Sequence, residues 1–351
     1  MLLRWTYRVL CAMLCCIVCS CNVHEWPEYK GPIDLRLNFI FHTDLPQYLV
    51  IDETLSRSST SPYDYDVRYI VDVYVLNADG SVKEPPIQRF VFTKDDVDQL
   101  NYQTNVVIPA GNYRLIAWAD FVDEGTERDK FYGADDLTSV ILLGDIHEGN
   151  NDFRDAFVGR TDIVIPQQEA EPYTLEATID MGRPLAKYNF VSTDLEDFLT
   201  RVFELRAEKM AAGSTEFTAA DLSPSSVDYN DFKIVFTYED HMPNVFDCVD
   251  NKPRNAKSPG VTFESKIKPI SASEAELGFD YIFVNGIEAE IKVKVEVYDR
   301  DETLLSRTRA IPVPIIRSKL TTIRGNMLTR ITSGGVGIKP DFEDEYIYWV
   351  D

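Results

Sequence analysis

The chain has 351 residues, with 58 Asp and Glu against 35 Lys and Arg and a net charge of −23. A surface this acidic repels nucleic acid and anionic headgroups, so we expect no nucleic-acid partner. The length predicts about two domains, and the 18 Tyr and 19 Phe residues are typical of half-buried strands.

The N-terminal residues predict an export signal. Arg4 and Arg8 form a short basic start, and residues 9–18 form an uncharged run, VLCAMLCCIV. This run is far shorter than the roughly 20 apolar residues that a membrane-spanning helix needs. It has the length of the apolar core of a secretory signal, so residues 1–20 are expected to be a signal peptide.

The run ends in Val18-Cys19-Ser20-Cys21, which resembles the lipobox of bacterial lipoproteins. The resemblance implies that the Cys21 thiol receives diacylglycerol, that cleavage occurs before Cys21, and that the new amine is acylated, for instance with palmitate. Several acyl chains together attach a protein stably to a membrane, whereas one chain binds only marginally. The alternative is a plain cleavable signal that has cysteines in its apolar core.

Cysteine usage predicts that the exported chain has no disulfide of its own. Cleavage would remove Cys11, Cys15, Cys16 and Cys19. With Cys21 lipidated, Cys248 is the one remaining thiol. We expect Cys248 to be a small apolar core residue, and the alternatives are a reactive thiol or an intermolecular partner.

Alternation of apolar and polar residues predicts a first β-sandwich over residues 33–180, after a polar tether at 21–32. Its first strand, at 35–41, has one wet face, and a long polar loop follows at 45–65. Further strands are predicted at 67–75, 89–93, 106–108, 113–118, 162–165 and 173–180. We expect a tight hairpin at 109–112, where Gly111 provides conformational freedom.

A second β-sandwich is predicted over residues 181–351, with the boundary at 181–184. A helix is expected to follow Thr193, because Thr193 and Glu196 form a capping box before an apolar face. Nothing on that face has chemical character, so we expect the helix to cover an edge or end of a sheet.

Strands of this second half are predicted at 233–238, 261–267, 279–284, 287–297, 303–311 and 318–329. The segment 346–350, YIYWV, is predicted to be either a last strand or a strand lent to a neighbour. The sequence therefore predicts an all-β protein of two tandem antiparallel β-sandwiches, with one short helix in the second domain.

Residues for catalysis or metal binding form no recognisable pattern. The histidines, His24, His42, His147 and His241, lack the spacing of a zinc-binding helix. Residues 145–152 contain oxygen ligands and a glycine, but their order does not match a calcium loop. Cys248 and His241 lie in a Pro-containing stretch and make a weak nucleophile pair. We expect no catalytic site, no metal site and no cofactor, and a protein that is not an enzyme.

Several segments in this order resemble the FimB-type fimbrial subunit and anchor lipoproteins of Bacteroidales, which build type V pili. They are the lipobox, the strand at 35–41, PAGNYRLIAW at 109–118, RPLAK at 183–187, and IPVP at 311–314 followed by LTTIRGN at 320–326. Family members usually carry an Arg-Asn pair before the Leu-Thr-Thr-Ile stretch, where this chain has Arg317-Ser318.

The resemblance implies two tandem transthyretin-like sandwiches that assemble with other pilus subunits by strand exchange. It also implies a role in cell adhesion at the outer membrane, exposed on the surface as part of the fimbrium and anchored by lipid on Cys21. In polymerising members proteolysis removes the first strand. Arg57, in the Ser-rich stretch after that strand, is the candidate cut site, and the alternative is a plain loop arginine. In anchor members the first strand stays in place, so we favour an anchor or minor component.

Two other function classes remain open from the sequence. One is a surface glycan-binding lipoprotein of a nutrient-uptake system, which would expose aromatic residues on a sandwich face. Outside the signal peptide the tryptophans are Trp26, Trp118 and Trp349, and Trp118 lies in an expected core strand. The other class is a periplasmic or surface hydrolase, which would need carboxylates clustered in a cleft.

Overall fold

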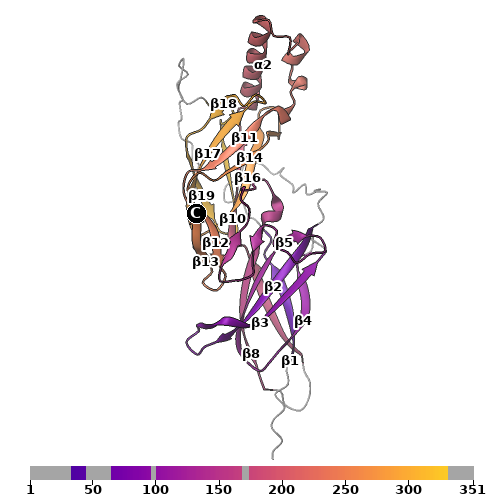
Figure 1. The fold of residues 1–351 in the computed structure, drawn as a ribbon, viewed down its shortest axis with the longest axis vertical. Coiled ribbons are helices and arrows are strands. Elements are labelled where there is room, and N and C mark those ends of the chain that lie inside the picture. Colours follow the sequence, from indigo (N-terminus) through magenta and orange to yellow (C-terminus); the bar gives the residue numbers. More distant parts are fainter. Residues whose placement is uncertain (1–32, 45–64, 96–99, 168–173, 331–351) are drawn as a thin grey trace, which may run out of the picture.

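The computed structural model describes residues 33–44, 65–95, 100–167 and 174–330. They form an elongated molecule in which two β-rich lobes lie along the long axis, with one long helix at the far end of the second lobe (Figure 1). The predicted all-β class is confirmed. Cys21, Arg57 and the segment 346–350 lie outside the described residues.

The first lobe contains a seven-stranded sheet. Its strands are β1 (Ile33–Phe41), β2 (Tyr65–Leu76), β3 (Val82–Lys94), β4 (Tyr102–Ile108), β5 (Gly111–Asp123), β8 (Phe157–Ile165) and β9 (Thr174–Gly182). They are hydrogen-bonded in the order β3-β2-β5-β8-β9-β1-β4. β1 and β9 run parallel, whereas we expected antiparallel strands throughout. The long stretch of chain between them makes a parallel pairing possible.

This sheet folds over on itself, so that its two halves form opposite layers. The bend lies between β8 and β9, which pair through two residues on each strand, including Gly159 and Met181. A Cβ atom on Gly159 would lie 2.6 Å from the carbonyl oxygen of Asp180, so this close approach requires glycine. Across the interior, Phe39 of β1 packs on Tyr69 of β2 with ring centroids 5.4 Å apart.

The expected hairpin at 109–112 is wrong, although strands lie on both sides of it. β4 pairs with β1, whereas β5 pairs with β2 and β8, so the chain crosses between the two layers at this point. Gly111 is needed for a different reason. A Cβ atom there would lie 2.5 Å from the Tyr113 hydroxyl oxygen.

The second lobe consists of two packed sheets. One has the order β15-β16-β10-β20, formed by β15 (Lys268–Pro269), β16 (Ala275–Phe283), β10 (Leu185–Ser192) and β20 (Leu320–Gly325). The other has the order β14-β11-β17-β18, with β19 also paired to β17. Its strands are β14 (Thr262–Ser265), β11 (Lys233–Tyr238), β17 (Glu288–Tyr298), β18 (Leu304–Arg307) and β19 (Ile311–Ile316). β10 and β20 form a second parallel pair, again unlike the expectation.

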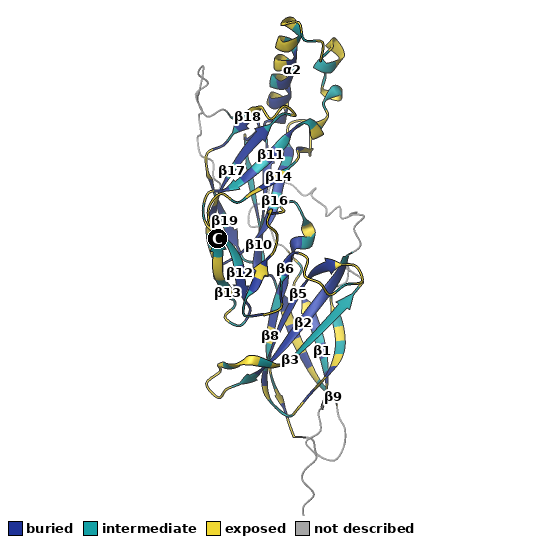
Figure 2. Ribbon diagram, in the orientation of Figure 1, coloured by how far each residue is buried: buried dark blue, intermediate teal, exposed yellow. Residues whose placement is uncertain are grey.

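A small sheet joins the two lobes. It has the order β13-β12-β7-β6, formed by β6 (Tyr132–Gly133), β7 (Val140–Leu142), β12 (Met242–Asp247) and β13 (Lys252–Lys257). β6 and β7 come from the chain between β5 and β8, and β12 and β13 come from the second lobe. Buried residues occur in the strands of both lobes (Figure 2), and they form one continuous core. At the junction, Trp118 of β5 lies near Phe283 of β16, with ring centroids 6.5 Å apart.

The predicted helix is confirmed as α2 (Leu195–Ala211), and its apolar face is buried as expected. Four short 3-10 helices accompany it in the described chain: η1 (Asp152–Arg154), η2 (Ala219–Leu222), η3 (Pro224–Ser226) and η4 (Tyr229–Asp231). The expected capping box is wrong, because Asp194 is the N-cap residue and makes no side-chain cap bond. The Asp194 carboxylate instead accepts the backbone N–H groups of Leu328 and Thr329.

Cys248 is buried and unpaired, which confirms the prediction of a core residue. Burial raises the pKa of its thiol well above the ordinary value, which disfavours the reactive thiolate. His241 is exposed, so it does not share the surroundings of Cys248. Within the described chain, no helix has both the length and the apolar character needed to cross a bilayer.

Candidate functional site

The first candidate site is β1, the strand that the sequence predicted at 35–41. It lies inside its sheet, because β4 pairs with it on one side and β9 on the other. The antiparallel register with β4 places Leu37 opposite Thr104, and the parallel register with β9 places Leu37 opposite Ala177. The first strand predicted from the sequence is therefore fully embedded in the first lobe.

The apolar face of β1 fills the interior of the lobe. Leu35 and Leu37 are completely buried, and Phe39 and Phe41 are nearly so. Phe41 packs edge-on against Phe157 with ring centroids 5.0 Å apart. Each such side chain contributes about 1.5–3 kcal/mol when it is removed from water, so this face holds β1 in place more strongly than its polar face does.

The opposite face of β1 is polar and reaches solvent. Arg36 forms an ion pair of 2.9 Å with Glu176 of β9, and both side chains are about half exposed. Asn38 accepts a hydrogen bond from the Gln103 side chain of β4. These contacts fix the register of β1 but add little stability, because exposed ion pairs contribute less than about 1 kcal/mol.

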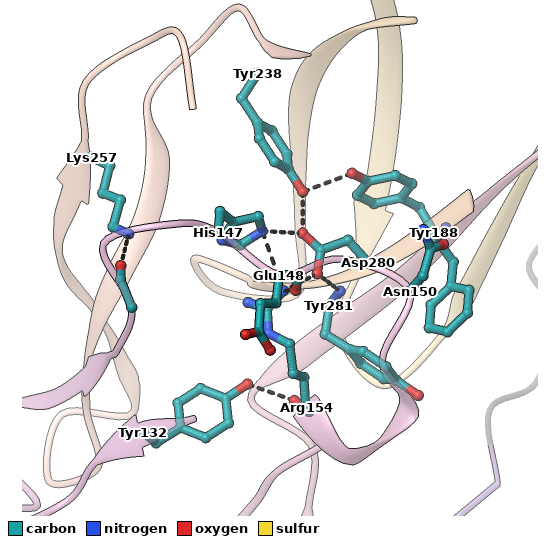
Figure 3. Close-up of polar contacts among 12 residues, drawn as sticks. Tyr132, His147, Glu148, Asn150, Arg154, Tyr188, Tyr238, Lys257, Asp280 and Tyr281 are labelled. Carbon is teal, nitrogen blue, oxygen red and sulfur yellow. Dashed lines mark hydrogen bonds and ion pairs between the residues drawn. The ribbon is translucent and has the colours of Figure 1, made fainter. Parts of the chain in front are cut away.

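A second constellation lies at the junction of the lobes, where Asp280 of β16 is the centre of a buried polar cluster (Figure 3). One carboxylate oxygen lies 2.5 Å from the His147 Nε2 atom, and the other accepts from Arg154 Nη1 at 2.5 Å. The Tyr238 hydroxyl also donates to this carboxylate, and it lies 2.7 Å from the Tyr188 hydroxyl. We call these five residues the junction cluster.

The junction cluster joins distant parts of the chain. His147 and Arg154 lie between β7 and β8, whereas Asp280, Tyr238 and Tyr188 belong to the second lobe. Burial alone would raise the pKa of Asp280, but the Arg154 guanidinium and the hydrogen bonds from His147 and Tyr238 outweigh burial and lower the pKa. Burial raises the pKa of Tyr188 and of Tyr238 well above the ordinary value, so both remain neutral donors.

The junction cluster does not have the geometry of a reaction site. The side chains of His147 and Asp280 are each 1% exposed, so a substrate cannot reach them. Sequence analysis did not find this cluster, because His147 and Asp280 lie 133 positions apart. One signal in the sequence could have indicated it. Asp280 is the one carboxylate within the apolar run at 279–284, and a buried charge needs a polar partner.

The segment 145–152, which the sequence analysis considered as a calcium loop, contacts the second lobe at this junction. Asn150 adopts a positive φ of 55° and accepts the backbone N–H of Phe279 at 2.7 Å. Asp152 pairs with Lys187 of β10 at 2.6 Å. Across the described residues, no three His, Cys, Asp or Glu side chains are grouped so that they could hold a metal ion.

A pocket of about 220 Å³ lies beside α2 at the far end of the second lobe. Its apolar part is formed by Val202, Leu205, Phe217, Phe232 and Leu305. Three cations surround the Phe217 ring at 5.2–5.8 Å from its centroid, namely Arg206, Lys209 and Arg300. Lys209 and Arg300 pair with carboxylates, and Arg206 donates to a backbone carbonyl, so the pocket offers apolar contact area rather than free charge.

We expect Asp280→Asn to lower the free energy of unfolding by about 3–5 kcal/mol, because the Arg154 guanidinium would stay buried without its counter-charge. Urea unfolding followed by circular dichroism measures the loss. Glu176→Gln is the matched control, since it breaks an exposed ion pair and should cost less than about 1 kcal/mol. Equal losses in the two variants would contradict the role of the junction cluster.

This stability difference should also depend on pH. The folded protein lowers the pKa of Asp280 from its unfolded value of about 3.9. The carboxylate therefore stabilises the fold in full above about pH 4, and this stabilisation is lost as the pH falls through the folded value. The difference between wild type and Asp280→Asn should narrow in acid, and a widening difference would count against this assignment.

Comparisons with known proteins bear on the chain as a whole. The Porphyromonas gingivalis fimbrial anchor protein Mfa2 is 12% identical over 79% of this chain and 82% of its own, with a TM-score of 0.38. A candidate cell adhesion protein from Bacteroides eggerthii is 11% identical over 86% of this chain and 90% of its own, with a TM-score of 0.42. Likenesses at these scores establish neither the fold nor the function of this chain.

Sequence comparison gives a firmer assignment. A search of proteins with curated functions finds no match. A family model, in contrast, matches residues 32–350, which is nearly all of the chain beyond the predicted signal and tether. The chain therefore belongs to a family of unknown function, DUF6562.

Proposed function

We propose that this chain is a lipid-anchored fimbrial subunit of the outer membrane, an anchor or minor component that joins other pilus subunits by β-strand exchange in cell adhesion. The observation that carries the proposal is the position of β1. This strand comes first in the sequence of strands, yet it lies between β4 and β9 with its apolar face buried. The resemblance to FimB-type lipoproteins supports the mode of assembly, and the lipobox at Cys21 supports the attachment.

The position of β1 supports one particular role in a pilus. Strand exchange requires one subunit to accept a strand and another to lend one. A subunit whose own β1 fills the space between β4 and β9 has no acceptor groove there, but it can still lend a strand. In a polymer linked in one direction, such a subunit stands at one end, and lipid on Cys21 would hold that end at the membrane. We propose the segment 346–350 as the lent strand.

We also propose that the protein binds partners and does not catalyse a reaction. The buried carboxylate, imidazole and guanidinium of the junction cluster are closed to solvent, which supports this view. The alternative of a glycan-binding lipoprotein finds less support, because Trp118 is completely buried and offers no platform for a sugar ring.

Cys21→Ala should abolish the incorporation of labelled palmitate and move the protein out of the membrane fraction. The reason is that the thiol and the new amine of Cys21 are the proposed sites of acylation. Cys19→Ala is the matched control, because it removes a thiol two positions earlier and should leave labelling and fractionation unchanged. Continued labelling of the Cys21→Ala protein would contradict the lipid anchor.

Deletion of the gene should change the length, number or attachment of pili, as seen by electron microscopy of cells and sheared fractions. Complementation with the full chain should restore the wild-type pili. A chain that ends at residue 345 should remain in the membrane but fail to restore attachment, because the proposed lent strand is missing. Unchanged pili after deletion would overturn the proposed function, and restoration by the shortened chain would overturn only the assignment of the lent strand.

A further inference from the structure

The end of β1 is held on both sides where the chain leaves the sheet. On the β4 side, the backbone N–H of Phe41 donates to the Asn101 side-chain oxygen at 2.9 Å. On the β9 side, the backbone N–H of His42 donates to the Met181 carbonyl at 3.0 Å. Hydrogen bonding therefore continues past the last strand residue, where a strand end would ordinarily fray.

A buried guanidinium makes a third attachment at this end of β1. Arg183 lies between β9 and β10, and its side chain is completely buried. Its Nη1 atom donates to the carbonyl oxygens of His42 at 3.3 Å and Asp44 at 3.2 Å. Its Nε atom donates to the Asp155 carboxylate at 2.8 Å. One side chain thus connects a buried carboxylate to two carbonyl groups of the segment that follows β1.

The second lobe holds Arg183 in position through its main chain. The Arg183 carbonyl accepts hydrogen bonds from Arg317 Nε at 3.0 Å and from the Ser318 hydroxyl at 3.2 Å. Arg317 is held in turn by the side chain and carbonyl of Asn251. These contacts fix the main chain at Arg183, and the Asp155 carboxylate fixes its guanidinium.

Removal of β1 would leave the buried Arg183 Nη1 group without these two acceptors. An unsatisfied donor on a buried charged group is costly, and hydrogen bonds to charged groups are the stronger ones. Neither the guanidinium contacts nor the strand pairing depends on an intact chain between residues 45 and 64. Cleavage in that segment would cut the chain but would leave all of these contacts in place.

We propose that Arg183, with Asp155, is a latch that keeps β1 in the first lobe even when the chain has been cut between residues 45 and 64. This inference rests on the proposed function, in which the subunit keeps its own β1 and presents no acceptor groove. Arg183 is then a positioning residue that decides between retention and release of β1, and proteolysis near Arg57 does not decide it alone.

The test uses the full chain purified in detergent, with a recognition site for a sequence-specific protease inserted next to Arg57. After cleavage, gel filtration followed by mass spectrometry measures how fast the N-terminal fragment leaves the remainder.

We expect nicked Arg183→Lys to release the fragment at least about tenfold faster than the nicked wild type, because lysine keeps the charge beside Asp155 but loses the forked donor geometry. Nicked Arg36→Gln is the matched control, since Arg36 also ties β1 to β9 but through an exposed ion pair, and its release rate should stay within about threefold of wild type.

A purely structural role for Arg183 predicts a different outcome. In that case uncut Arg183→Lys would lose stability throughout, and nicking would release β1 no faster than in wild type; this result would overturn the latch. If Arg183→Lys does not fold, the nicked Asp155→Asn protein decides, because Asp155 holds the Arg183 guanidinium. The latch predicts that this variant also releases the fragment faster than the nicked wild type, and release at the wild-type rate would overturn it.

The latch and the proposed function can fail separately. Fast release of β1 from the nicked wild type would contradict the latch proposal, but it would leave the result of the gene deletion unchanged. Conversely, unchanged pili after gene deletion would contradict the fimbrial role, but slow release of β1 from the nicked wild type would still support the latch.

Discussion

The first lobe depends on one constraint, which is that β1 finds both of its hydrogen-bonding partners far along the chain. Its pairing with β4 and β9 closes the layer that covers β2 and β5, and its four inward side chains fill the interior. Among the described residues, β1 is held by distant segments, so its retention rests on burial, strand pairing and the contacts at its end. A strand of this kind is physically suited to exchange, and in the proposed function its retention would distinguish an end subunit from a polymerising one.

The junction of the lobes shows the same reliance on contacts between distant segments. A small sheet draws strands from both lobes, and the junction cluster neutralises Asp280 of the second lobe with Arg154 from the chain between β7 and β8. Buried ion pairs cost desolvation and add little net stability, but they specify one arrangement over others.

Much of the fold could be predicted from the sequence, because the alternation of apolar and polar residues reports locally on which strand face is buried. The pairing of strands could not, because it depends on partners that alternation does not identify. The prediction of a hairpin at Gly111 was wrong for this reason, because β4 and β5 lie in different layers. The capping box failed because Asp194 and Thr193 bind the chain near Leu328 and Asn326 instead of the helix. For the candidate site, the importance of the first strand was visible in the sequence, whereas its attachment to Arg183 depends on tertiary structure alone.

The central claim, that the subunit works with its own β1 in place, can be tested directly by fastening that strand. Asn38 of β1 lies opposite Gln103 of β4, and their side chains meet on the exposed face, so Asn38→Cys with Gln103→Cys can form a disulfide between the two strands. The measurement is the number of attached pili on cells that carry the crosslinked double variant, with and without reductant. The account predicts wild-type numbers in both conditions, because β1 never leaves the sheet. Loss of attached pili in the crosslinked state, with recovery after reduction, would contradict it.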